Sequence, residues 1–166
     1  MAPVVLLAGG TGGAKLARGL LDELGPDLTV IANTGDDLEI YGAYVSPDPD
    51  LVTYWLADVI DERGWGLRDD TFAVMTQLRA LGEDVWFNLG DRDLAVGLHR
   101  AGRLARGARL TETIDELRRA FDVPARVLVP SDAPVRTHVK TGGRWRAFQD
   151  YMIRARGEVE DVAFRG

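Results

Sequence analysis

The amino-terminal segment constrains the fold most strongly, because an apolar run there breaks into a glycine-rich loop and then into a helical pattern. The run is Val4–Ala8, the loop is residues 9–13 (GGTGG), and the helical pattern follows over residues 14–21. In α/β proteins, a buried strand, a glycine loop and a helix start together present backbone N–H groups to a phosphate. We therefore expect an α/β protein that binds a nucleotide or another phosphorylated ligand.

The amino-acid sequence of this loop differs from two common phosphate-binding motifs. A P-loop ends in Gly-Lys-Ser/Thr, whereas this loop continues as Gly13-Ala14-Lys15. A dinucleotide fingerprint needs a third glycine at the position where Lys15 stands. The alternative to a phosphate site is a tight strand-to-helix turn that uses glycines for positive φ and binds nothing.

Composition points to one globular domain and limits its partners. The chain has 166 residues, of which 46% are hydrophobic and 28% charged, as in ordinary globular domains. Its net charge is −6 with both signs interspersed, so we expect no nucleic-acid partner. Cysteine is absent, which excludes disulfides and thiolate metal sites. Without a signal-peptide pattern or a long apolar run, we expect a cytoplasmic protein and no membrane partner.

The pattern of apolar runs predicts a Rossmann-like three-layer α/β fold with a mainly parallel sheet. A second apolar run over residues 28–32 follows the first helix, and continuous hydrophobicity in both runs predicts helices on both faces of the sheet. We predict further helices over 51–60, 72–81, after 93 and over 111–121, the last with Thr113 and Glu116 as a capping box. Strands are predicted over 85–89 and 126–130. The tail is predicted to contain strands around Gly142-Gly143, a short helix over 147–153 and a strand over 162–164. Because no repeat or linker interrupts residues 1–166, we expect a single α/β domain.

Acidic residues gather in two loops that we place at the ligand-binding edge of the sheet. Asp36 and Asp37 follow the second strand, and such close carboxylates repel unless a divalent cation or hydrogen-bond donors stabilise them. A solvated acidic turn is the alternative. Residues 46–50 (SPDPD) place Asp50 just ahead of a helix, where it either meets a ligand or caps the helix.

A third polar loop, residues 90–93, sets Arg92 between two carboxylates. The guanidinium of Arg92 either grips a phosphate or pairs with its neighbours. His99 and His138 stand without a nucleophile nearby in the sequence, so we interpret them as surface or core residues. Trp65 lies between two glycines, an exposed setting in which it could meet a flat ligand.

Six segments, in their order and spacing, resemble the 2-phospho-L-lactate transferase family of coenzyme F(420) biosynthesis. They are residues 9–16, 33–42, 46–50, 64–66, 86–95 and 148–151. The resemblance covers essentially the whole chain, but members of that family are much longer, so the chain resembles the N-terminal part of a longer and here incomplete fold. The resemblance implies transfer of a phospholactyl or phosphoenolpyruvyl group from a guanosine diphosphate-type donor to the terminal hydroxyl of the deazaflavin Fo, with release of GMP and a requirement for Mg²⁺.

The resemblance also implies roles for particular residues. The group near the donor phosphates comprises Gly10, Thr11, Gly12 and Lys15. Asp36, Asp37 and Asp50 are the candidates to hold the metal, or to orient and deprotonate the attacking hydroxyl. The candidate catalytic residues are Asp50, Asp37 and Arg92. Asp50 and Asn88 correspond to positions that contact Fo, and several family members carry lysine in place of Asn88.

Two other functions stay open on the sequence. One is a regulator of the gluconeogenesis-factor type, which binds a nucleotide sugar without transferring a group. The other is a nicotinamide-dependent oxidoreductase, which the missing third glycine disfavours. We expect the chain to form a homodimer that covers apolar surface.

Overall fold

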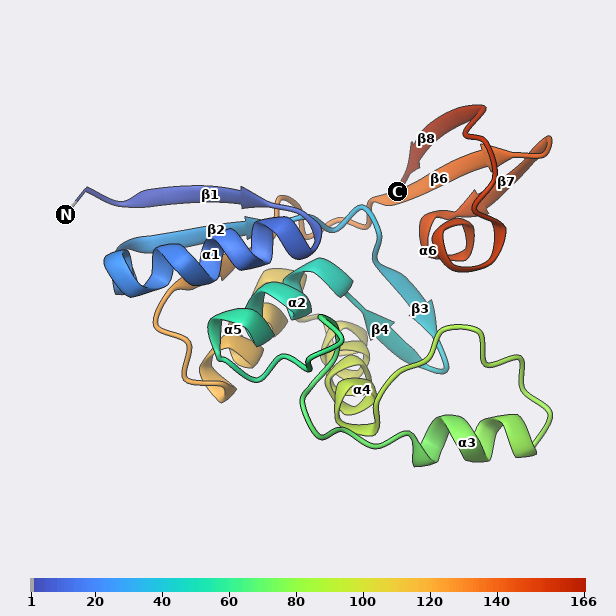
Figure 1. The fold of residues 1–166 in the computed structure, drawn as a ribbon, viewed down its shortest axis with the longest axis horizontal. Coiled ribbons are helices and arrows are strands. Elements are labelled where there is room, and N and C mark those ends of the chain that lie inside the picture. The colour runs from blue at the N-terminus through green and yellow to red at the C-terminus, as the bar shows by residue number, and fades with distance from the viewer. Residues whose placement is uncertain (1) are drawn as a thin grey trace.

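The computed structural model describes residues 2–166 and begins with a parallel sheet (Figure 1). Its strands, in the order β1-β2-β5, are β1 (Val4–Ala8), β2 (Leu28–Ala32) and β5 (Arg126–Leu128). Val4 pairs with Leu28, and the register runs to Ala8 beside Ala32. The predicted α/β class with its β-α-β start is therefore confirmed. The two other sheets are antiparallel.

Helix α1 (Gly10–Leu24) begins inside the glycine loop, four residues before the predicted start. Gly10 has a φ of +64°, a conformation that glycine adopts without the steric cost of a Cβ. Ala14 and Ala17 form the buried face of the helix, and small residues there allow a close approach to the sheet. A 3-10 turn, η1 (Gly25–Asp27), with Pro26 in its first positions, leads from α1 into β2.

A β-hairpin that the sequence analysis missed follows β2. Strands β3 (Leu38–Ile40) and β4 (Ala43–Val45) are joined by Tyr41 and Gly42, which both have positive φ, the geometry of a tight two-residue hairpin turn. Helix α2 (Pro47–Leu56) then begins at Pro47, because proline suits the first helical position. Asp50 thus lies in the first turn of the helix, so the alternative in which it caps the helix is wrong.

The middle of the chain contains α3 (Ala73–Ala80), α4 (Asp91–Ala105) and α5 (Leu110–Ala120). The strand predicted over 85–89 is wrong, because these residues pair with no other strand and run as an irregular segment, where the Phe87 N–H donates to the Tyr41 hydroxyl. The predicted capping box is also wrong. Glu112 closes the start of α5 by accepting from the Arg109 N–H at 2.9 Å.

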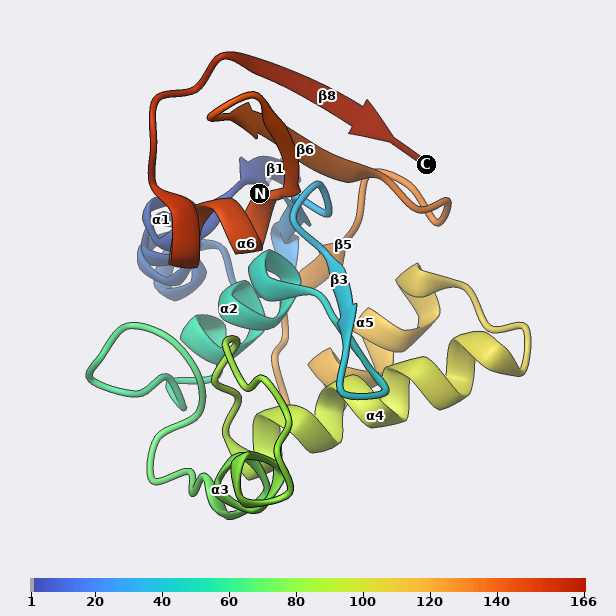
Figure 2. The same cartoon turned by 90° about the vertical axis from the view of Figure 1, so that its right-hand side faces the viewer.

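The tail forms a small antiparallel sheet in the order β7-β6-β8. This sheet lies to one side of the parallel sheet in Figure 1, and Figure 2 shows β6 and β8 next to each other. Its elements are β6 (Arg136–Thr141), β7 (Arg144–Ala147), α6 (Phe148–Asp150), the π-helical turn η2 (Tyr151–Ala155) and β8 (Asp161–Arg165). The predicted turn at Gly142-Gly143, the short helix and the last strand are confirmed. The Thr137 N–H donates to the Gly35 carbonyl at 2.6 Å, so this sheet is anchored beside the loop that follows β2.

Within the described residues, helices cover only one face of the parallel sheet. Helices α1, α2 and α5 lie on that face, where Leu28, Val30 and Val127 are fully buried (Figure 1). On the opposite face, Val5 is 59% and Leu7 76% exposed. The prediction that both faces are covered is therefore wrong for this chain. None of the helices within residues 2–166 combines the length and apolarity needed to cross a membrane.

Candidate functional site

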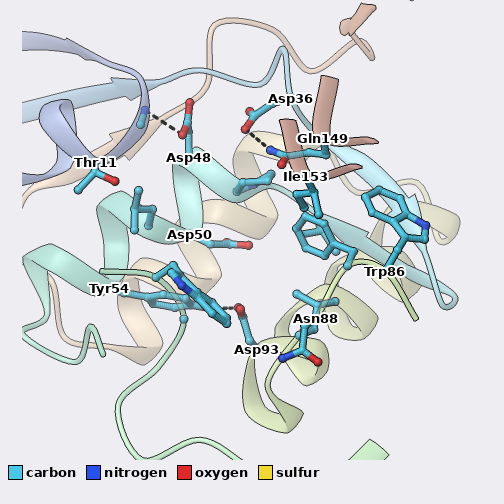
Figure 3. Close-up of a pocket in the computed structure, with 18 residues that line it drawn as sticks. Thr11, Asp36, Asp48, Asp50, Tyr54, Trp86, Asn88, Asp93, Gln149 and Ile153 are labelled. Carbon is cyan, nitrogen blue, oxygen red and sulfur yellow. Dashed lines mark hydrogen bonds between the residues drawn. The ribbon is translucent and has the colours of Figure 1, made fainter. Parts of the chain in front are cut away.

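A cavity of about 520 Å³ opens between the first turn of α1, the start of α2 and the irregular segment before α4 (Figure 3). Its apolar and aromatic lining residues are Val45, Leu51, Tyr54, Trp65, Trp86, Phe87, Leu89 and Ile153. Polar groups of the lining come from Gly10, Thr11, Asp36, Asp48, Asp50, Asn88, Asp93 and Gln149. Within residues 2–166 no lysine or arginine lines the cavity, so no cationic side chain of the lining itself neutralises these carboxylates.

The start of α1 forms the end of the cavity that suits a phosphate. The Gly10 N–H donates to Asp48 Oδ1 at 2.9 Å, so a carboxylate from α2 occupies part of the positive end of α1 (Figure 3). No acidic residue of α1 itself lies in its first turn. Thr11, beside Gly10, also faces the cavity. The glycine loop thus brings helix-terminal backbone to the cavity, as its sequence predicts.

Asp36 and Asp48 form a carboxylate pair next to this helix terminus. The Asn33 amide donates to Asp36 Oδ1 at 3.3 Å and to Asp48 Oδ2 at 3.0 Å, and Gln149 donates to Asp36 Oδ2 at 2.9 Å. Burial, and then the charge of Asp48, raise the pKa of Asp36 to about 7. Among residues 2–166, no three acidic or histidine side chains converge as a complete metal site. Any cation here would need further oxygen ligands from a substrate or water.

Asp50 lies in the cavity wall with an arginine behind it. Arg100 on α4 donates from Nη1 to Asp50 Oδ2 at 3.0 Å and from Nη2 to Asp50 Oδ1, so its guanidinium grips both carboxylate oxygens. Arg100 is 1% exposed and Asp50 6% exposed. Burial raises the pKa of Asp50, and the charge of Arg100 opposes that rise. The sequence analysis missed Arg100, although its position on the apolar stripe of α4 with Leu94 and Gly97 is a signal that could have been used.

A second missed pair, Tyr54 and Asp93, closes the cavity beside Asp50. The Tyr54 hydroxyl donates to Asp93 Oδ1 at 2.8 Å (Figure 3). Burial, and then the charge of Asp50, raise the pKa of Asp93 to about 6. The polar loop that holds Asp93 was noted for its arginine, yet its second carboxylate is the group that reaches the cavity.

Five of the predicted site residues line the cavity: Gly10, Thr11, Asp36, Asp50 and Asn88. The Asn88 side-chain oxygen accepts a hydrogen bond from Arg79 at 2.9 Å. Trp65 also lines the cavity and is 43% exposed, in keeping with the predicted exposed setting. Residues 10–11, 36, 50 and 88, which are distant in sequence, therefore meet around one cavity.

Four other predicted site residues, Gly12, Lys15, Asp37 and Arg92, lie outside the cavity lining. The Lys15 ammonium lies 5.5 Å from the centre of the Trp55 ring. Asp37 is buried behind the cavity, where Ser46 donates to it at 2.7 Å, and burial raises the pKa of Asp37 to about 7. The Arg92 side chain is exposed and donates to the Arg68 carbonyl at 3.2 Å. The roles assigned to these four residues stay predictions.

This arrangement combines the parts that a group transfer between a diphosphate and an aromatic acceptor needs. The start of α1, aromatic rings and buried carboxylates line the same cavity, and in the view of Figure 3 Asp50 lies between Thr11 and Trp86. The helix terminus suits phosphate oxygens, the rings suit a planar ligand, and a carboxylate can orient a hydroxyl.

The chain is similar in sequence to two kinds of transferase. A phosphoenolpyruvate transferase of Kitasatospora aureofaciens is 41% identical over 168 residues, which cover 96% of this chain and 52% of that protein. A 2-phospho-L-lactate transferase of Methanosarcina mazei is 40% identical over 167 residues, which cover 98% of this chain and 55% of that protein. This chain therefore spans about half the length of these relatives.

Structural similarity extends to a protein of another name. A crystal structure of a UPF0052 family member from Bacillus halodurans has a TM-score of 0.55 and 19% identity, covering 99% of this chain and 51% of that one. At this identity the likeness concerns the fold alone. The family model described as 2-phospho-L-lactate transferase CofD matches residues 4–165. Because that match takes in nearly every residue of the fold and of the cavity, the chain belongs to the 2-phospho-L-lactate transferase (CofD) family.

Proposed function

We propose that this chain forms the acceptor and diphosphate sites of a CofD-type transferase in coenzyme F(420) biosynthesis. In the proposed reaction, the terminal hydroxyl of the deazaflavin Fo attacks the phosphorus that bears lactate or enolpyruvate in a guanosine diphosphate-type donor. A new P–O bond forms, the bond to the phosphate of GMP breaks, and the hydroxyl proton passes to a carboxylate. The observation that carries this proposal is that the start of α1, several aromatic rings and buried carboxylates line one and the same cavity.

The aromatic side chains that line the cavity suit the acceptor Fo. Fo contains a planar three-ring system, and flat ligands pack well against aromatic side chains. Trp65, Trp86 and Phe87 supply such surfaces, with the last two rings arranged edge to face at 5.7 Å between centres. A volume of about 520 Å³ also falls within the usual range of small-molecule sites. The resemblance assigns Asp50 and Asn88 to the same ligand, and both line this cavity.

The start of α1 suits the donor. A diphosphate gains from the helix dipole and from backbone N–H groups at Gly10 and Thr11. Asp48 already accepts from the Gly10 N–H, so a second negative group would need a cation between them. This requirement favours a metal-bridged diphosphate over a bare one.

The residues present fit a magnesium ion at Asp36 and Asp48. Mg²⁺ is commonly held by one or two carboxylates together with substrate phosphates. Burial, and then the charge of Asp48, raise the pKa of Asp36 to about 7, and a cation beside the two carboxylates would favour the ionised form of Asp36. When bound there, the metal would neutralise charge on the reacting phosphoryl group. Asp37 and Asp50, also predicted as ligands, are less available in this structure, because Asp37 lies outside the lining and Arg100 takes both oxygens of Asp50.

The chain's own side chains would perform the remaining tasks. Asp50 can accept a hydrogen bond from the acceptor hydroxyl through lone pairs that Arg100 leaves free. Asp93, held by Tyr54, lies in the same wall and offers a further carboxylate to the reacting end of the acceptor. Trp65 and Phe87 would exclude water from that end of the cavity.

Separate titrations of the two ligands test the proposal. Fo binding is followed by deazaflavin fluorescence and GDP binding by calorimetry, each with and without Mg²⁺. We expect both ligands to bind, GDP more tightly with Mg²⁺, and Asp48→Asn to abolish the Mg²⁺ effect on GDP. Asp22→Asn, which alters an exposed carboxylate that pairs with Arg18, is the matched control and should behave as the wild type.

The same titrations distinguish the competing functions. A wild-type chain that binds neither Fo nor GDP would refute the proposal. Saturable binding of a uridine diphosphate sugar in place of Fo and GDP would instead support the regulator, and hydride transfer with NADH or NADPH would support the oxidoreductase.

A further inference from the structure

Arg100 is the largest side chain buried completely within residues 2–166, and it is charged. It comes from the middle of α4, a helix that otherwise presents Leu94 and Gly97 to the interior. A buried guanidinium is costly unless its donors are matched by acceptors, so its contacts indicate why it is retained.

Its contacts converge on one carboxylate of the cavity wall. Nη1 donates to Asp50 Oδ2 and to the Tyr44 carbonyl, both at 3.0 Å, and Nη2 donates to Asp50 Oδ1. The Tyr44 carbonyl fixes the guanidinium to β4, while the two contacts to Asp50 form a planar fork. Because a fork binds both oxygens, it fixes the rotation of the carboxylate as well as its position.

Asp50 itself has little other support. Within residues 2–166, no side chain other than Arg100 donates a hydrogen bond to its carboxylate, which lines the cavity together with Asp93. Without the guanidinium, a buried carboxylate among other acids would take up a proton or turn away. Lysine has a single ammonium and cannot reproduce the fork.

We propose that Arg100 is a positioning residue that holds the Asp50 carboxylate in the orientation that binds the hydroxyl end of the acceptor. This inference rests on the proposed binding of Fo in the cavity. Arg100 itself does not line the cavity and acts only through Asp50. An arginine buried only to tie α4 to α2 would instead affect the stability of the whole chain and both ligands alike.

A double-mutant cycle on Fo binding tests the proposal. The variants are Arg100→Lys, Asp50→Asn and the two together, each checked by circular dichroism and thermal unfolding. Dissociation constants are measured for Fo by fluorescence and for GDP with Mg²⁺ by calorimetry. Arg103→Lys is the matched control, because Arg103 lies on the same helix and pairs with Glu116 at the surface.

We expect each single change at Arg100 or Asp50 to weaken Fo binding at least tenfold while GDP affinity stays within twofold of the wild type. In the double variant the loss should be no greater than in Asp50→Asn alone, because residues that act through one another are not additive. If Arg100→Lys does not fold, Arg100→Gln in the Asp50→Asn background removes both charges together. That variant should bind Fo as Asp50→Asn does.

Other outcomes overturn the inference. The positioning role would be refuted if Arg100→Lys bound Fo as tightly as the wild type. It would also be refuted if the losses of Fo affinity caused by the two single changes multiplied in either double variant. Equal losses of Fo and GDP affinity would show that Arg100 is only structural. A wild-type chain that does not bind Fo would refute the proposed function and this inference with it, a result distinct from unchanged binding by the variant.

Discussion

Gly13 marks the closest approach of α1 to β1, and replacing it should destabilise the protein. A Cβ on Gly13 would lie 2.8 Å from the Cβ and 2.9 Å from the Cα of Ala8, closer than carbon atoms pack. Since Ala8 belongs to the strand, relief requires a movement of α1 or β1. Forcing extra atoms into a packed interior costs about 1–3 kcal/mol.

Gly12 is the matched control for this substitution. A Cβ on Gly12 meets nothing within 4 Å, and both glycines lie in the first turns of α1. Each change to alanine gains a similar backbone-entropy term of about 0.5–1 kcal/mol, which cancels in the comparison. Gly13→Ala should therefore be less stable than Gly12→Ala by about 2 kcal/mol, or melt roughly 6 °C lower at 2–4 °C per kcal/mol.

Thermal and urea unfolding of the two variants measure this difference. GDP titration adds a second measurement, because a shift of α1 should weaken GDP binding in Gly13→Ala. Gly12→Ala is the control for stability alone, because the resemblance places Gly12 near the donor phosphates. If Gly13→Ala melts at or above Gly12→Ala, the close packing of α1 on β1 is refuted.

Three further predictions concern pH, packing and the metal. Burial raises the pKa of Asp93 from 3.8 to about 6. Because the folded protein then holds this proton more tightly than the unfolded chain, Asp93 contributes its full stabilisation below pH 3.8, and this contribution is lost as the pH rises through 6. In Asp93→Asn, the decline in the free energy of unfolding between pH 4 and 6 should be smaller, as urea unfolding at each pH would show. Leu28→Ala should cost about 2–5 kcal/mol, whereas Leu7→Ala should cost less than about 0.5 kcal/mol; equal losses would mean that the outer sheet face is covered. Chelation of Mg²⁺ should weaken GDP binding by the wild type about tenfold, or ~1.4 kcal/mol, and leave Asp48→Asn unchanged in calorimetry.

Local patterns predicted the elements that depend on neighbouring residues. The strand, glycine loop and helix at residues 4–24 are encoded by an apolar run, glycines and helical spacing within one short segment. The turn at Gly142-Gly143 was predictable for the same reason, since glycine adopts positive φ without steric cost. The prediction of a strand over 85–89 was wrong, because a short aromatic run forms a strand only if a partner strand lies beside it.

The sequence by itself determined the α/β class, the family and the glycine loop as the phosphate-binding candidate, because these reside in local patterns and in motif order. Only the tertiary structure decided which acids share the cavity. It brought Asp50 to Arg100, fifty residues along the chain, and set Asp37 behind the wall. It also left Val5 and Leu7 exposed. Such outcomes depend on how distant helices and strands pack, which the chemistry of neighbouring residues does not specify.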